Sequence, residues 1–231
     1  MKPMQVLGIE LKDYSVREAM RMVDGFLQDA KVSTIGFVSM DILMAAGEDE
    51  ELRTWLEAMD LTVPVSSEIL QAAGIGGRSR IAEVEEGRFY RELMKKVSDE
   101  NRTAFLLTEK EETTEPFLTF LQESAPGLKI VGSFAFENLS GDPDVVVNEI
   151  NSTFPDLVLS RLPSPGSEQF IYDHKAKLNA RLWVSLKEDF SPQDQKKPSG
   201  LAKLRQWVKT KLFRHRASRF TNEQDRNEEK S

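Results

Sequence analysis

Short apolar strands alternate with amphipathic helices along most of this 231-residue chain, and the alternation limits the possible folds more than any other feature. The apolar segments 34–38 and 103–107 predict buried strands. Between such segments the apolar residues recur with a helical period, as in 16–27, which a capping box of Ser15 and Glu18 precedes. We therefore expect an α/β protein with a Rossmann-like, mostly parallel sheet and helices on both faces.

The remaining elements follow from the same patterns. Further strands are expected at 61–65, 128–131, 157–159 and 182–186, and another apolar run covers 6–9. Helices are expected at 41–59, 66–73, 89–97, 114–123, 145–151 and 168–179. Ligands of parallel sheets collect at the carboxyl ends of the strands, so we expect a site in the loops that follow them. These loops begin at Ser39, Pro64, Thr108, Gly132, Ser160 and Lys187.

Composition excludes several kinds of chemistry. The chain has no cysteine, which rules out disulfides, thiolate nucleophiles and cysteine zinc sites. Its two histidines, His174 and His215, are too far apart in sequence to suggest a multi-histidine metal centre. There is no run of eighteen apolar residues and no signal-like N-terminus, so we expect a cytoplasmic protein that does not span a membrane. The glycine cluster 74–77 lacks the spacing of a phosphate-binding loop and predicts a helix end.

Charge divides the chain into unlike parts. The whole chain has 31 basic and 38 acidic residues, a net charge of −7. Residues 196–220 contain nine basic residues and no acid, and residues 221–231 contain two basic and four acidic ones. Residues 1–195 therefore hold 20 basic and 34 acidic side chains, a net charge of −14. We expect an α/β domain at 1–195, a basic amphipathic appendage at 196–220 and a disordered tail at 221–231.

The basic appendage has the pattern of a helix that lies on a membrane surface. At 100° per residue, Leu201, Leu204, Val208 and Leu212 share an arc of about 80°, flanked by Trp207. Basic residues mostly line the other side, where they would attract anionic lipid. The predicted membrane-binding residues are Lys203, Leu204, Arg205, Trp207, Val208, Lys209, Lys211, Leu212 and Arg214.

Other partners also fit a basic helix. It could dock on the acidic body of its own chain, on a partner protein or on a second copy of the chain. Nucleic acid is not expected, because a body with a net charge of −14 repels it.

Four segments resemble one family in their order and spacing. They read VLGIELKDYSVREAM, MDILMAAGEDEELRTWLEAMDLTVP, TAFLLTEKEETTEPFLTFLQESAPGLKIVG and INSTFPDLVLSRLPSPGSEQFI. From about residue 6 to about residue 190 the chain resembles the WecG/TagA/CpsF glycosyltransferases. The resemblance implies a Rossmann-like fold and the transfer of N-acetylmannosamine, or a related N-acetylhexosamine, from a UDP-sugar to a polyprenyl-diphosphate-linked acceptor in bacterial envelope-polymer synthesis. It also implies a basic C-terminal appendage at the membrane, and no cofactor besides the UDP-sugar donor.

The site motifs of that family are altered in this chain. Pro64-Val65-Ser66 stands where the family has Pro-Asp-Gly, whose Asp is the proposed catalytic base, and Met40 stands at the Asn of its Thr-x-Asn. Thr108-Glu109 replaces paired glycines that would let backbone N–H groups approach a diphosphate. Further replacements are Val84 for an Arg, Ser160-Arg161-Leu162 for Gly-Leu-Gly, Ser164-Pro165-Gly166-Ser167-Glu168 for Ser-Pro-Lys-Gln-Glu, and Lys187-Glu188 for Gly-Gly. Together these changes match the decay of a nucleotide-sugar site, since Val65 cannot accept a proton.

The acids and hydroxyls nearest the altered motifs are the candidate site residues. We predict Glu68 or Asp41 as a substitute base at a helix start. In the structural alternative the helix dipole merely stabilises each acid in a first turn, with Ser66 as the cap before Glu68. The candidate substrate-binding residues are Ser66, Ser164, Glu168 and Gln169, of which Glu168 aligns with the family's Glu.

Two functions remain open from the sequence. The first is a divergent glycosyltransferase, peripheral on the inner face of the cell membrane, with the substitute base described above. The second is a catalytically inactive pseudo-glycosyltransferase that acts as an accessory or regulatory partner in the same pathway. An unrelated α/β protein is a third interpretation. No metal is expected in any of them.

Overall fold

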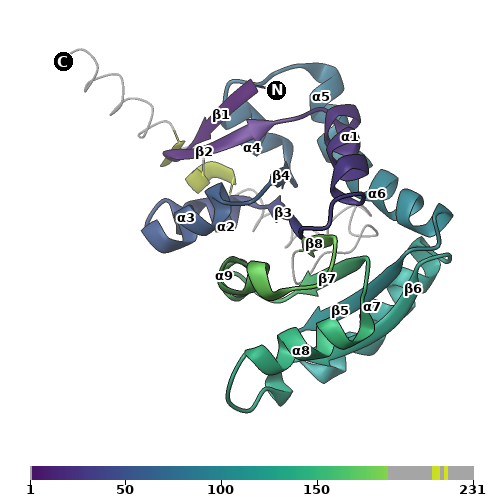
Figure 1. The fold of residues 1–231 in the computed structure, drawn as a ribbon. Coiled ribbons are helices and arrows are strands. Elements are labelled where there is room, and N and C mark those ends of the chain that lie inside the picture. The colour runs from purple at the N-terminus through teal and green to yellow at the C-terminus, as the bar shows by residue number, and fades with distance from the viewer. Residues whose placement is uncertain (1, 187–209, 214–215, 218–231) are drawn as a thin grey trace.

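The computed structural model of the chain describes residues 2–186, 210–213 and 216–217. Its centre is a six-stranded sheet in the order β4-β3-β8-β7-β5-β6, and every pair of neighbouring strands is parallel (Figure 1). The predicted α/β fold with a parallel sheet is therefore confirmed. The strands are β3 (Ser33–Val38), β4 (Leu61–Pro64), β5 (Thr103–Thr108), β6 (Lys129–Ala135), β7 (Leu157–Arg161) and β8 (Leu182–Ser185).

Helices cover both faces of the sheet, as expected. On one face, α1 (Val16–Phe26), α6 (Arg88–Asp99) and α7 (Glu111–Ser124) bury a single apolar cluster against alternate strand residues. The other face carries α2 (Met40–Ala46), α3 (Glu50–Glu57), α8 (Asp144–Thr153) and α9 (Gly166–His174). Strand β5 shows why, since Ala104 and Leu106 point into the first cluster and Phe105 and Leu107 into the opposite one.

The N-terminal part differs from the sequence-based expectation. The apolar run 6–9 is not a strand of the main sheet but the turn of an antiparallel hairpin, formed by β1 (Lys2–Val6) and β2 (Ile9–Asp13). Leu7 and Gly8 both adopt positive φ there, which gives the turn the twist that a two-residue hairpin needs. The hairpin packs over α2 and α3 through a shared apolar cluster.

The glycine cluster 74–77 separates two short helices. Helix α4 (Ser67–Ala72) ends just before it, as predicted, and Gly74 has a φ of 73°. Helix α5 (Arg78–Glu85), which the sequence analysis did not include, begins directly after Gly77. Its position is fixed by polar contacts, because Arg80 lies 2.8 Å from Asp13.

Two similar clasps hold the amino-terminal edge of the sheet. Asp156, just before β7, accepts hydrogen bonds from the backbone N and Oγ1 of Thr103 on neighbouring β5, and its own N–H donates to that Oγ1. Asp60 and Thr34 repeat the arrangement between β4 and β3. Each clasp fixes the register of two parallel strands at the edge opposite the candidate site.

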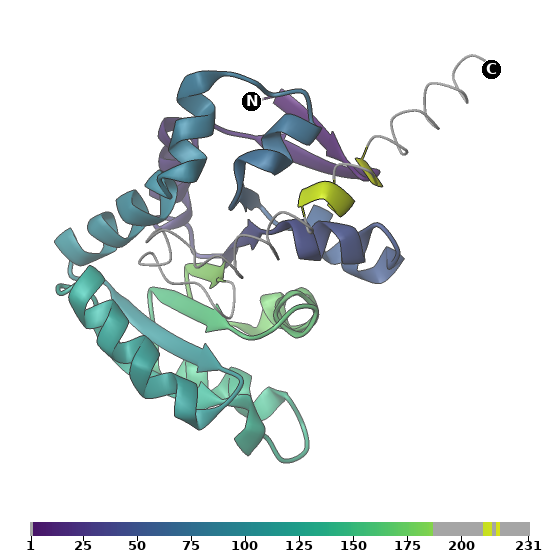
Figure 2. The ribbon, with the colours of Figure 1, turned by 180° about the vertical axis from the view of Figure 1, so that it is seen from behind.

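The described part of the C-terminal segment is helical at 210–213 and lies against the hairpin and α2 in both views (Figures 1 and 2). Phe213 is fully buried in the cluster that the hairpin, α2 and α3 share, and Ala217 packs against the same cluster. Arg216 lies 2.6 Å from Glu48, which follows α2. Leu212, by contrast, is 53% exposed. Of the predicted membrane-binding residues, Lys211 and Leu212 are described, and the others lie outside the described residues: Lys203, Leu204, Arg205, Trp207, Val208, Lys209 and Arg214.

Within the described ranges, none of the helices has the length and apolar composition needed to cross a membrane.

Candidate functional site

A cavity of about 660 Å³ opens at the carboxyl ends of β3, β7 and β8. From β3 the chain crosses outward to β4, and from β5 it crosses outward to β6 at the other edge, so these two connections leave in opposite directions on either side of β8 and β7. This is where α/β proteins bind ligands. The residues that line the cavity come from the ends of these strands, from the loops after them and from α2, α3, α7 and α9. They are Phe37, Ser39, Asp41, Ile42, Ala45, Leu52, Thr113, Leu162, Pro163, Ser164, Pro165, Glu168, Ser185 and Leu186.

Strand β3 and helix α2 supply one wall of the cavity. The Ser39 hydroxyl caps α2 by accepting a hydrogen bond from the backbone N of Ile42 at 3.3 Å. This cap starts the helix at the cavity edge and places Asp41, half-buried, in its first turn. Phe37 lies beneath, its ring held against Phe89 with 5.9 Å between ring centroids.

The loop from β7 to α9 supplies the opposite wall and a buried carboxyl. Glu168, in the first turn of α9, is 5% exposed. Burial raises the pKa of its carboxyl above the ordinary value of 4.5, and hydrogen bonds from its own backbone N–H and the Ser164 hydroxyl oppose part of the rise. The Oε2 atom of Glu168 has no hydrogen-bond partner among the described residues. A buried carboxyl oxygen of this kind is suited to bind a ligand hydroxyl or to exchange a proton with it.

A chain of buried hydroxyls fixes this wall from below. The Oγ atom of Ser167 lies 3.0 Å from the Oγ atoms of both Ser160, on β7, and Ser185, on β8. Ser185 also accepts a hydrogen bond from the indole Nε1 of Trp183 at 2.8 Å. The first turn of α9 is thereby tied to two strand ends, and Ser185 itself reaches the cavity. None of these hydroxyls was predicted from the sequence as a site residue. They could have been found because Ser160 and Ser167 stand at altered motif positions.

The structure brings together three of the six predicted site residues, Asp41, Ser164 and Glu168, at one cavity. Glu68 lies in the first turn of α4, and Ser66 stands at the N-cap position, but the Ser66 hydroxyl makes no capping hydrogen bond to that helix. Neither is part of the cavity lining. Gln169 is exposed and also lies outside the lining. Roles for Glu68, Ser66 and Gln169 in substrate binding or catalysis therefore stay predictions.

The charged side chains in the described lining of the cavity are acidic. Asp41 and Glu168 are its charged lining residues, and the described lining contains no Lys, Arg or His. In the parts of the chain that the structure describes, no group of three or more acidic or histidine side chains could hold a metal ion. The remaining lining is apolar, as at Phe37 and Leu162, or carries hydroxyls.

The altered motif positions after β5 are filled by side chains. Thr108 is buried at the end of that strand, and its hydroxyl lies 2.6 Å from the Thr114 hydroxyl on α7. Thr113, beside it, reaches the cavity. A contact between strand and helix thus stands at the position where the resemblance expects a glycine.

A parallel α/β sheet with a cavity across its carboxyl edge defines a ligand-binding domain of the Rossmann-like class. The family model described as glycosyl transferase WecG/TagA/CpsF matches residues 4–188. The chain therefore belongs to this family of glycosyltransferases of cell-envelope polysaccharide synthesis. No curated protein matches the chain.

Proposed function

We propose that this protein transfers an N-acetylhexosamine from a UDP-sugar to a polyprenyl-diphosphate-linked acceptor, and that the cavity beside Asp41 and Glu168 is the site of transfer. The observation that supports this proposal is the position of two carboxyls from different elements at the carboxyl edge of the sheet. One of them, Glu168, is the residue that aligns with the Glu of the family motif.

The chemistry needs a proton acceptor beside the acceptor hydroxyl. As that hydroxyl oxygen forms a bond to the sugar C1, the bond from C1 to the diphosphate oxygen breaks, and UDP leaves with the electron pair. The hydroxyl proton passes to a carboxylate, for which Glu168 and Asp41 are the candidates within the cavity. The raised pKa of Glu168 makes its ionised form a stronger base than an exposed carboxylate.

Three variants separate the possible bases. We expect Glu168→Gln or Asp41→Asn to lower kcat by about 100-fold or more, the loss that removal of a general base produces. Glu68→Gln serves as the matched control, because Glu68 lies outside the cavity lining. The assay follows transfer from UDP-N-acetylhexosamines to a lipid-linked acceptor. If only Glu68→Gln loses activity, the base is Glu68 and the cavity carboxyls are not the catalytic groups.

A second candidate function is an inactive accessory protein of the same pathway. It is favoured by Val65, which follows β4 in place of the family's proposed base, and by the lack of basic side chains in the described lining. Calorimetric titration of the purified protein with UDP and UDP-N-acetylhexosamines distinguishes the two. Micromolar binding of a UDP-sugar with turnover supports the transferase, whereas no binding at millimolar ligand supports the accessory role.

We further propose that the C-terminal segment holds the protein on the anionic inner face of the cell membrane. Phe213 anchors the segment to the body from one side of the helix, and Leu212 and Lys211 are exposed. Leu212 belongs to the apolar stripe predicted to enter the lipid surface. Docking on the body and binding to a membrane therefore use different sides of the segment. A protein partner or a second copy of the chain is the alternative occupant of this surface.

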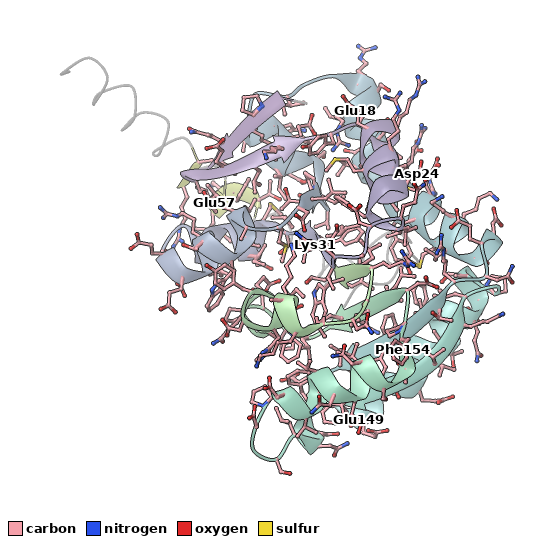
Figure 3. All side chains as sticks on the ribbon, viewed as in Figure 1. Glu18, Asp24, Lys31, Glu57, Glu149 and Phe154 are labelled. Atoms are coloured by element: carbon pink, nitrogen blue, oxygen red, sulfur yellow. The ribbon has the colours of Figure 1, made fainter. Side chains whose placement is uncertain are left out.

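The body of the protein carries many acidic side chains, so the basic C-terminal segment is the part of the chain best suited to contact anionic lipid. Figure 3 shows acids of the body that come from several helices, among them Glu18 and Asp24 on α1, Glu57 on α3 and Glu149 on α8. Such a surface repels both nucleic acid and anionic lipid. Flotation with phosphatidylglycerol vesicles tests the membrane proposal. We expect the full chain to float and a chain lacking residues 201–220 to remain in solution, and equal flotation of both would contradict it.

A further inference from the structure

We propose that two copies of this protein pair through strand β6, so that their two six-stranded sheets join into one continuous sheet. The two copies of β6 run antiparallel across a twofold axis. Strand β6 is one end of the strand order, and β4 is the other. The proposal concerns an edge of the sheet and not the cavity, so it does not depend on the proposed function.

Strand β4, at one end of the sheet, is covered. It is four residues long, all four are buried, and it ends at Pro64, which has no N–H to offer a further strand. The hairpin strand β2 packs beside it. On β2 the backbone N–H of Glu10 donates to the Glu57 carboxylate at 2.9 Å. The described hairpin therefore closes this end of the sheet to pairing with another strand.

Strand β6, at the other end, has the features of an open edge. It is seven residues long and contains no proline, and no described strand pairs with its outer side (Figure 1). In a parallel ladder, alternate residues point their N–H and C=O groups to opposite sides, so about half of these groups on β6 face away from β5. An edge of this kind is completed when another strand pairs with it.

The charges at the two ends of β6 favour a second copy as the pairing strand. Lys129 begins the strand and is exposed, and Glu137 is exposed two residues past its end. Lys129 lies four residues before Ser133, and Glu137 lies four residues after it. Antiparallel pairing of two copies about Ser133 therefore places Lys129 of each copy opposite Glu137 of the other. The twofold axis repeats this match, so the edge is complementary to itself.

Small and apolar side chains lie close to the same edge. Gly132 and Ser133 are near the middle of β6, and a Cβ atom on Gly132 would lie 3.5 Å from Cγ2 of Thr153, the last residue of α8. The next residue, Phe154, is 70% exposed and has a φ of 47°, which is uncommon for an aromatic residue (Figure 3). Its ring is apolar surface whose burial by a second copy would stabilise the pair.

Pairing through a single open edge ends at two copies. A twofold contact uses the same surface on both partners, so each copy spends its β6 edge in the contact. The joined sheet then has a β4 strand at each end, and the described hairpin covers both of these ends. We therefore expect a closed dimer and no longer assembly.

Sedimentation velocity of the full chain measures the assembly. We expect a species of twice the chain mass that dissociates on dilution. A monomer at every concentration would overturn the proposal, and so would particles that keep growing beyond two copies.

Single cysteines locate the contact, because the chain has no cysteine of its own. Ser133 is exposed on β6, and opposite side chains of paired antiparallel strands have Cβ atoms about 4.5–5.5 Å apart. We expect a short thiol-to-thiol crosslinker to join two copies of Ser133→Cys. The matched control is Thr54→Cys, which is also exposed but lies on α3 beside the hairpin, and it should remain a single chain. A dimer in which both variants crosslink equally would contradict pairing through β6.

Charge reversal tests the register of the two strands. Lys129→Glu places like charges opposite each other at both symmetric positions and should weaken the dimer by about 10-fold. The addition of Glu137→Lys restores opposite charges and should return the affinity close to that of the wild type. Lys12→Glu, exposed on β2, is the control for the change in net charge. A dimer that Lys129→Glu does not weaken, or that Lys12→Glu weakens equally, would overturn the proposed pairing.

Discussion

The Oγ atom of Ser167 lies 3.0 Å from the Oγ atom of Ser185, and this contact joins the first turn of α9 to the end of β8. Ser167 is followed directly by Glu168, whose carboxyl reaches the cavity. The buried hydroxyls therefore hold in place the wall that carries the candidate acid. Ser160 and Ser167, two of these hydroxyl residues, stand at motif positions that the resemblance marks as altered.

Removal of the central hydroxyl should destabilise the protein measurably. Ser167→Ala leaves the buried oxygens of Ser160 and Ser185 without one partner each. Loss of such buried hydrogen bonds costs about 1–3 kcal/mol of unfolding free energy. Urea denaturation measures the change, with exposed Gln169→Ala as the control, expected within about 0.5 kcal/mol of the wild type. Equal unfolding midpoints for both variants would show that the hydroxyl chain contributes nothing to stability.

The buried carboxyl predicts a specific pH dependence of stability. Because the folded pKa of Glu168 is raised above 4.5, its neutral form is favoured in the folded state. Its contribution to the unfolding free energy is therefore fully present below pH 4.5 and is lost as the pH rises through the folded pKa. Glu168→Gln should be closest in stability to the wild type below pH 4.5 and should gain on it at higher pH. A difference between the two proteins that does not change with pH would contradict the burial of this carboxyl.

The clasp of Asp156 and Thr103, at the opposite edge of the sheet, predicts a pH dependence of stability with the opposite sign. Asp156 is partly buried, which favours its neutral form. Hydrogen bonds from the backbone and side chain of Thr103 and from Arg102 nevertheless hold its pKa below the ordinary value of 3.8. Its contribution is present above pH 3.8 and is lost as the pH falls through the folded pKa. Asp156→Ala should lower the unfolding free energy by about 1.5–3 kcal/mol at pH 7 and by less at pH 3.

Ligand binding gives the control for that variant. The clasp lies at the amino-terminal edge of the sheet, whereas the cavity lies at the carboxyl edge. At a temperature where Asp156→Ala remains folded, its affinity for any cavity ligand should equal that of the wild type. A large loss of affinity in the folded variant would mean that the two edges are coupled.

Phe213 should decide whether the C-terminal segment stays on the body. Its side chain is fully buried, so Phe213→Ala removes the main apolar contact that the described segment makes with the hairpin and α2. We expect trypsin to cleave at Lys211 and Arg216 at least several-fold faster in this variant, while the body resists digestion. Leu212→Ala is the matched control, because that side chain is 53% exposed. Equal cleavage rates in both variants would show that Phe213 is not the anchor.

The sequence predicts the sheet well because its strands are buried on both faces. Segments such as 103–107 and 157–159 are continuous apolar runs between amphipathic helices, and such a pattern has few alternative folds. The hairpin was missed because its turn consists of Leu7 and Gly8, in the middle of an apolar run, so that pattern alone gives no break. Helix α5 was missed because its apolar residues have no clear helical period.

Part of the predicted set of site residues lies at the cavity and part does not, and sheet topology explains the difference. Asp41 was predicted as an acid next to an altered motif, and Glu168 as the residue that aligns with the family's Glu. Both follow strand ends, and those ends meet at one edge of a parallel sheet. Glu68 also follows a strand end, but its strand β4 is the outermost in the sheet, and the cavity forms near the centre. Strand order depends on packing between distant segments, which the local pattern does not encode. The burial of Phe213 rather than Leu212 also depends on packing against distant segments, the hairpin and α2.

A crystal structure of the full chain with a UDP-N-acetylhexosamine tests the central claim most directly. We expect the sugar ring inside the cavity, with a hydroxyl within hydrogen-bond distance of the Glu168 carboxyl. A sugar bound away from both Asp41 and Glu168 would contradict the proposed site of transfer.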